Sequence, residues 1–209
     1  MCCGVCKSAG FNSRTKLALL TCSETPQWVF RLSKTFFSGG SVKISMYQAS
    51  VPVFSRALNN LAAILEKAAA HAEAKKIDPA VMISYRLYPD MLPLSKQVQI
   101  ATDSAKGGAA RLAGGEPPKY EDTEASFSDL IARLRKTVAY LESLKPEQID
   151  GSEDRTVSWK TQTTTRTMQG MPYLLSHVTP NVYFHVSTAY DILRHCGVEI
   201  GKQDFLGKT

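Results

Sequence analysis

The segment at residues 170–197, GMPYLLSHVTPNVYFHVSTAYDILRHCG, limits most strongly what this chain can fold into. Apolar residues recur at helical spacing on two neighbouring faces of its second half, so a helix there must be covered on both sides. Asn181 and His185 lie on these faces. Because buried polar groups need hydrogen-bond partners, the segment predicts a helix inside a bundle. Pro180 predicts a kink or break, with Thr179 capping the second half.

Three further segments, at residues 50–75, 90–112 and 126–145, each carry one apolar stripe at helical spacing. The third opens with a capping-box pattern, a serine followed three residues later by an aspartate. Residues 155–159 and 165–170 alternate in character and are rich in threonine, which predicts a two-stranded hairpin. The sequence therefore predicts an all-α fold, a four-helix bundle with a small β-hairpin before the last helix.

The first 45 residues differ in composition from the rest. They hold six Lys and Arg side chains against one Glu, and four of the five cysteines. Such a segment is similar to a mitochondrial transit peptide or a palmitoylation cluster, and the alternative is a disordered stretch before a functional start at Met46. We expect residues 1–45 to be a disordered or targeting-like extension and residues 46–209 to form the domain. The single cysteine of the domain favours a cytoplasmic location, or a mitochondrial one if the extension is a transit peptide.

Residues 46–209 carry 19 basic and 18 acidic side chains, a nearly neutral balance. The basic cluster at Arg133, Arg135 and Lys136 is interpreted as a solvated helix face. Without a basic recognition helix, a helix-turn-helix DNA binder ranks third among the hypotheses, and no nucleic-acid partner is expected. No run of about 18 uncharged apolar residues is present, so no membrane span is expected.

Polar residues on the second predicted helix supply candidates for a site. Gln97 and Ser104 share a face, and Asp103 lies beside it. If this face looks into the bundle, these residues form a ligand pocket with Asn181 and His185. His185 is then a candidate general base working with Asp103. The alternative is a buried histidine that is hydrogen-bonded to Asp103, to Gln97 or to a backbone carbonyl.

Further candidates lie outside this face. Arg86 and Asp90 flank an extended link, where they predict an ion pair or turn anchor, and Arg86 could instead bind a ligand carboxylate. His177 and His195 are expected to pack at helix ends. The aromatic residues of the last segment are expected in the core and at a dimer interface, the first of them also lining the pocket: Tyr183, Phe184 and Tyr190.

Three stretches carry a family resemblance: YRLYPDMLPLSKQVQIATDSAKG (85–107), EPPKYEDTEASFSDL (116–130) and PNVYFHVSTAYDILRHCGVEIGKQDFLG (180–207). Together they resemble an uncharacterised domain-of-unknown-function family, number nineteen ninety-three, of the DinB/YfiT-like superfamily of metalloenzymes. The resemblance spans roughly residues 46–207. It implies an up-down-down-up four-helix bundle, often dimeric. In some members three histidines hold a metal, one on the second helix and two on the last in an H-x-x-x-H pair.

This sequence departs from that metal pattern. His185 matches one histidine of the last helix, but Ala189 and Asn181 stand four residues after and before it. The second helix has no histidine, and Ser104 is the nearest candidate for the ligand position. One imidazole with an amide and a hydroxyl suits zinc or nickel poorly. A divalent metal is therefore doubted, because two of the three superfamily histidines are absent.

Two main functions follow from these features, and the sequence leaves open whether the protein is an enzyme. The first is a DinB-like bundle with a cleft between the second and last helices, as a degenerate metal-dependent transferase or hydrolase or as a binder of small molecules. The second is a non-catalytic, dimeric helical interaction protein. The expected partners are a second copy of the chain and a small-molecule ligand.

Overall fold

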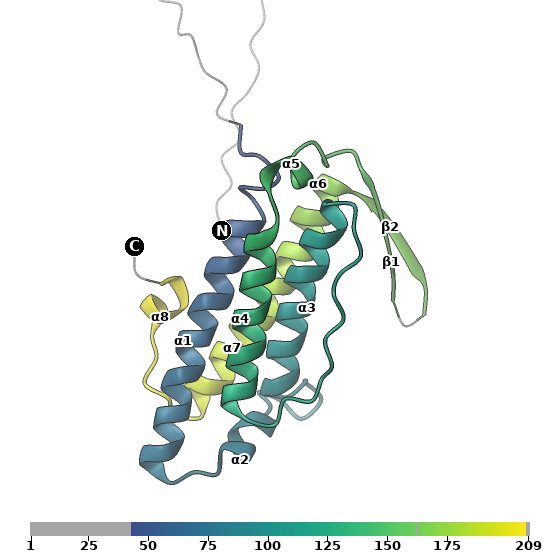
Figure 1. Ribbon diagram of the computed structural model, residues 1–209. Helices are drawn as coiled ribbons and strands as arrows, with labels where there is room; N and C mark the ends of the chain where they lie inside the picture. The colour runs from purple at the N-terminus through teal and green to yellow at the C-terminus, as the bar shows by residue number, and fades with distance from the viewer. Residues whose placement is uncertain (1–42, 162, 208–209) are drawn as a thin grey trace, which may run out of the picture. The chain divides into compact units, whose positions relative to one another are not determined.

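The computed structural model describes residues 43–161 and 163–207 (Figure 1). The predicted targeting-like extension falls almost entirely on residues 1–42, outside the described residues. The described part is mostly helical with one antiparallel hairpin, as predicted. None of its helices combines the length and the apolar character that crossing a membrane would require.

Four long helices contribute most of the structure: α1 (Val51–Lys75), α3 (Leu94–Leu112), α4 (Phe127–Ser143) and α7 (Thr179–His195). Shorter helical segments connect or follow them: α2 (Pro79–Ser84), α5 (Pro146–Ile149), α6 (Gly170–Pro172), the π-helical η1 (Tyr173–Val178) and α8 (Lys202–Leu206). The hairpin pairs β1 (Thr156–Lys160) with β2 (Thr165–Gln169), so that Trp159 lies opposite Arg166.

The long helices pack side by side. Helix α1 lies along α4, α3 lies along α7, and α3 also contacts α4. The loop at residues 113–126 returns along the length of the helices, so α3 and α4 run in the same direction (Figure 1). The apolar stripes predicted from the sequence face one shared core, whose fully buried members on α1 include Phe54, Leu58, Leu61 and Leu65.

The helix starts follow local chemistry. Ser126 Oγ accepts a hydrogen bond from the Asp129 N–H at 3.1 Å, and Asp129 Oδ2 accepts one from the Ser126 N–H at 3.0 Å. This confirms the predicted capping box of α4. Helix α3 starts at Leu94 rather than near Asp90, because a proline at position 93 disfavours helical geometry at the residue before it.

A kink or a break was predicted at Pro180, and the structure has no break there but a π-helix just before it. Segment η1 runs straight into α7, and the Thr179 N–H donates to the carbonyl of Leu174, five residues back. Thr179 does not cap α7, since its Oγ1 is buried without a hydrogen-bond partner in the described part of the chain. The wider turn lets Pro180 sit at the start of α7, where its missing N–H costs little.

Helix α3 comes very close to η1 at one glycine. A Cβ added to Gly108 would lie 2.4 Å from Val178 Cγ1. Only a residue without a side chain allows this separation, so Gly108 sets the distance between the two elements that form the site described next.

Candidate functional site

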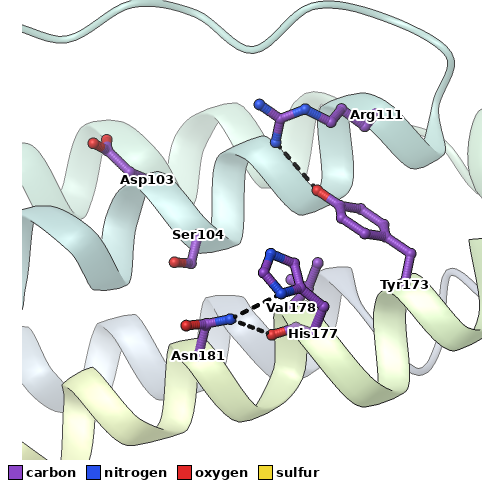
Figure 2. A pocket seen from close by; sticks show the side chains of 7 residues that line it. All are labelled: Asp103, Ser104, Arg111, Tyr173, His177, Val178 and Asn181. Carbon is purple, nitrogen blue, oxygen red and sulfur yellow. Dashed lines mark hydrogen bonds between the residues drawn. The ribbon is translucent and has the colours of Figure 1, made fainter. Parts of the chain in front are cut away.

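A pocket of about 200 Å³ lies between α3 and the η1–α7 segment (Figure 2). The sequence predicted a cleft between the second and the last long helix, and these two helices are α3 and α7. The pocket is lined by residues of α3 (Asp103, Ser104, Arg111) and of η1 and α7 (Tyr173, His177, Val178, Asn181). Three of the predicted site residues, Asp103, Ser104 and Asn181, are therefore brought together.

Arg111 and Tyr173 form one end of the pocket. Arg111 Nη1 donates a hydrogen bond to the Tyr173 hydroxyl oxygen at 3.1 Å. Tyr173 is only 1% exposed, and burial raises the pKa of its hydroxyl, which therefore stays protonated at neutral pH. Within residues 43–161 and 163–207, no acidic side chain forms an ion pair with Arg111. The half-buried Arg111 thus lines this space, and among the residues that the structure describes its side-chain hydrogen-bond partner is the Tyr173 phenol.

His177 stands in the middle of the pocket (Figure 2). Asn181 Nδ2 lies 3.3 Å from His177 Nδ1 and also donates to the His177 carbonyl at 2.6 Å. The imidazole packs on Trp159, with ring centroids 4.6 Å apart, and on Tyr173 at 5.6 Å. Burial lowers the pKa of His177, and the charges of Arg166 and Arg111 lower it further. His177 is therefore neutral at neutral pH, with Nδ1 positioned to accept from Asn181.

Sequence reasoning missed His177, Tyr173 and Arg111 as site residues. The signal was present: Tyr173, His177 and Asn181 follow one another at four-residue spacing. It was hidden because a proline at position 180 made the orientation of the preceding turn uncertain. The continuous η1–α7 helix aligns the three side chains.

His185 lies elsewhere, on α7 and buried. Its Nδ1 is 2.7 Å from Gln97 Oε1, and Gln97 Nε2 donates to the Leu92 carbonyl at 2.9 Å. Because an amide oxygen only accepts, His185 Nδ1 carries the proton of this bond. Gln97 is one of the three partners that the sequence suggested for a buried histidine. Neither His185 nor Gln97 lines the pocket with Asn181.

The Asp103 carboxylate is held by two cations. Its Oδ1 accepts from Lys106 Nζ at 2.6 Å and from Arg133 Nη2 at 2.8 Å. Figure 2 shows the carboxylate turned away from Ser104 and Asn181. Asp103 therefore borders the pocket, but its carboxylate points away from it and pairs with Lys106 on α3 and Arg133 on α4.

The interpretation of Arg133 as part of a solvated helix face is wrong. Its side chain is 2% exposed and donates to Thr102 Oγ1 at 2.8 Å, to Glu124 Oε1 at 2.9 Å and to the Glu121 carbonyl at 3.0 Å. Asp122 Oδ1 lies 3.1 Å away. Arg133 thus fastens the loop at residues 113–126, which directly precedes α4, to α3. Its partners on α3, Thr102 and Asp103, lie 31 and 30 positions earlier in the sequence.

Two further predicted site residues lie apart from the pocket. Arg86 Nη1 donates to the Met91 carbonyl, and no ion pair with Asp90 is present in the described chain. Tyr183 lines a separate, largely apolar pocket of about 380 Å³ beside α1 and α8. Phe184 is 56% exposed, so it is not a core residue, and its place at a dimer interface stays a prediction. The face of α7 that these aromatics occupy is turned outwards.

The metal site of the superfamily does not fit the donors found here. His185 Nδ1 is hydrogen-bonded to Gln97, and Ala189 occupies the position of the second histidine in the H-x-x-x-H pair of the superfamily. Across the described ranges, no group of three or more His, Cys, Asp or Glu side chains is placed to hold a metal ion. A zinc or nickel site requires several such ligands, so no chemistry is assigned to a metal.

His185 should make the stability of the fold sensitive to acid. Burial lowers the pKa of His185, so below about pH 6.5, the ordinary value for histidine, the unfolded chain binds a proton that the folded chain refuses. The free energy of unfolding should therefore fall as the pH decreases through this range. Urea unfolding of wild type and His185→Gln between about pH 7.5 and about pH 5.5 measures the effect.

The wild type should lose more stability on acidification than His185→Gln, whereas a His71→Gln control on α1 should follow the wild type. Equal pH dependence of the unfolding free energy in the wild type and His185→Gln would show that His185 is not the source of the acid sensitivity.

Comparison with known proteins places the chain in a family. Residues 46–206 match the family model described as "Domain of unknown function (DUF1993)". The crystal structure of a DinB family member protein from Shewanella denitrificans is 40% identical in sequence, with a TM-score of 0.71. The match covers 78% of this chain and 92% of that one. No curated protein matches the chain. As the resemblance predicted, this chain belongs to the family DUF1993 and is DinB-like.

Proposed function

We propose that this chain is a small-molecule-binding protein, built as an up-down-down-up four-helix bundle, with its ligand site between α3 and the η1–α7 segment. The packing of α1 on α4 and of α3 on α7 supports this architecture, as does the shared direction of α3 and α4 (Figure 1). The likeness to a DinB family member protein supports it as well.

The observation that carries the proposal is the convergence of polar groups on one open space. Arg111, His177 and Asn181 come from separate elements and surround about 200 Å³. Ligand sites typically combine a concave, partly apolar surface with a few such groups, and sites between the helices of a bundle are common. Val178 supplies part of the apolar surface.

The contacts favour binding over the alternative of a degenerate transferase or hydrolase. The residues predicted to perform that catalysis, His185 and Asp103, are each engaged by neighbouring side chains. The histidine that lines the pocket is His177, which is neutral because its pKa is lowered and whose Nδ1 faces the Asn181 amide. The enzymatic alternative therefore rests on a different histidine from the one that the sequence suggested.

A homodimer stays a prediction. Tyr183 and Phe184 are 37% and 56% exposed on α7, and Tyr183 borders the apolar pocket that also includes Phe205 and Leu206. Exposed aromatic side chains are enriched in protein interfaces. This observation favours the dimeric interaction protein as the second candidate function.

A fragment screen followed by NMR tests the binding proposal. Small fragments added to the ¹⁵N-labelled full chain should shift the amide signals of Ser104, His177 and Asn181. Ser104→Phe should abolish these shifts by filling the pocket, while Ser143→Phe, at an exposed position of α4, should keep them. The absence of any fragment that shifts pocket signals would overturn the proposal, as would shifts that persist unchanged in Ser104→Phe.

A further inference from the structure

Arg111 and Arg133 differ in the charges of their partners. Arg133 forms ion pairs with three carboxylates, whereas Arg111 forms none within the part of the chain that the structure describes, although Glu116 lines the neighbouring pocket with it. A guanidinium carries five N–H donors, and one of those on Arg111 donates to Tyr173. A partly buried cation without an anion keeps most of its desolvation cost, so an anionic ligand at Arg111 would offset that cost.

The charges around the pocket also favour an anion. The one carboxylate in its lining, Asp103, is already neutralised by Lys106 and Arg133. A second cation, Arg166, stands on β2 opposite Trp159, the residue that packs on His177. The surroundings of the imidazole are therefore positive on both sides, from α3 and from the hairpin.

Resting on the proposed function, we infer that the ligand carries a carboxylate and that Arg111 binds this group. A carboxylate matches the planar fork of a guanidinium with two parallel hydrogen bonds. The Tyr173 oxygen accepts from Arg111, which leaves the Tyr173 hydroxyl proton for the same carboxylate. The pocket volume of about 200 Å³ suits a small acid such as benzoate.

A carboxylate is a better match than a phosphate dianion. Arg111 is the one cation that lines the pocket, and His177 is neutral because its pKa is lowered. A dianion would be left with uncompensated charge in this partly buried space. The site therefore complements one negative charge.

Binding of three probes to the full chain tests the inference: benzoate, its neutral analogue benzamide, and inorganic phosphate. Titration calorimetry measures the affinity of each probe, and shifts of the His177 and Asn181 NMR signals show that the probe binds in the pocket. Benzoate should bind the wild type more tightly than benzamide or phosphate does. Arg111→Gln should weaken benzoate at least about tenfold, as expected for the loss of a charge-assisted pair. Arg111→Lys should give an intermediate affinity, because it keeps the charge without the fork.

The matched control is Arg135→Gln, an exposed arginine on α4, which should bind benzoate like the wild type. Equal binding of benzamide and benzoate would overturn the carboxylate assignment, and so would unchanged benzoate binding in Arg111→Gln, tighter binding of phosphate, or no benzoate binding at all. In each of these cases, fragments that shift the pocket signals would still uphold the proposed function, so the two failures are distinguishable.

Discussion

Replacing Arg133 with methionine should lower the free energy of unfolding by about 3–5 kcal/mol, the cost expected when one partner of a buried ionic network is removed. The side chain is 2% exposed and holds Asp103, Asp122 and Glu124 within 3.1 Å. Methionine fills much of the same volume but offers no N–H group, so Glu124, 10% exposed, loses its cation. Urea unfolding at neutral pH measures the loss.

Arg135 on the same helix provides the control. It pairs with Glu66 at 2.6 Å, but the two side chains are 67% and 51% exposed. Exposed pairs contribute about 0–1 kcal/mol, so Arg135→Met should remain close to the wild type. Similar losses in Arg133→Met and Arg135→Met would contradict the role given to the buried network.

Replacing Gly170 with alanine should also destabilise the fold, by about 1–3 kcal/mol, the range for forcing extra atoms into a packed site. A Cβ at this position would lie 1.9 Å from the carbonyl oxygen of Ser152. That oxygen belongs to the backbone, so no change of side-chain rotamer relieves the clash. The neighbouring Met171 N–H donates to the Glu153 carbonyl at 2.9 Å, and this bond holds together the segments before β1 and after β2.

The effect of Gly170→Ala should reach the pocket, because the same junction starts the segment that carries Tyr173 and His177. We expect lower stability in thermal and urea unfolding together with shifted NMR signals of His177. Gly201→Ala is the control, since a Cβ there meets nothing within 4 Å. Equal stability of Gly170→Ala and Gly201→Ala would contradict the prediction, because the backbone near Ser152 would then accommodate the added Cβ without loss of stability.

Much of the fold follows from local patterns. The apolar stripes that include Phe54 and Leu58 predicted helices because a 3.6-residue period places such residues on one face. The Ser126 capping box and the threonine-rich hairpin were equally readable, because both depend on residues close together in sequence. The family resemblance was confirmed by the match of residues 46–206.

The candidate site was only partly predictable. Periodicity identified Ser104 and Asn181 as inward-facing polar residues on two helices, and both line the pocket. It left Gln97, 88 positions before His185, as one of three possible partners, because the choice depends on the depth and rotation at which α3 meets α7. The same reason explains Arg133, whose burial comes from a loop that folds back over it.

By itself, the sequence determined the four long helices, the hairpin and the start of α4, because these arise from side-chain periodicity and from interactions within a few residues. Its resemblance to a known family also identified the family to which the chain belongs. Only the tertiary structure decided which polar side chains satisfy one another and which remain available to a ligand. Arg133 and Arg111 are both arginines on long helices, and packing surrounds the first with carboxylates while leaving the second beside a pocket.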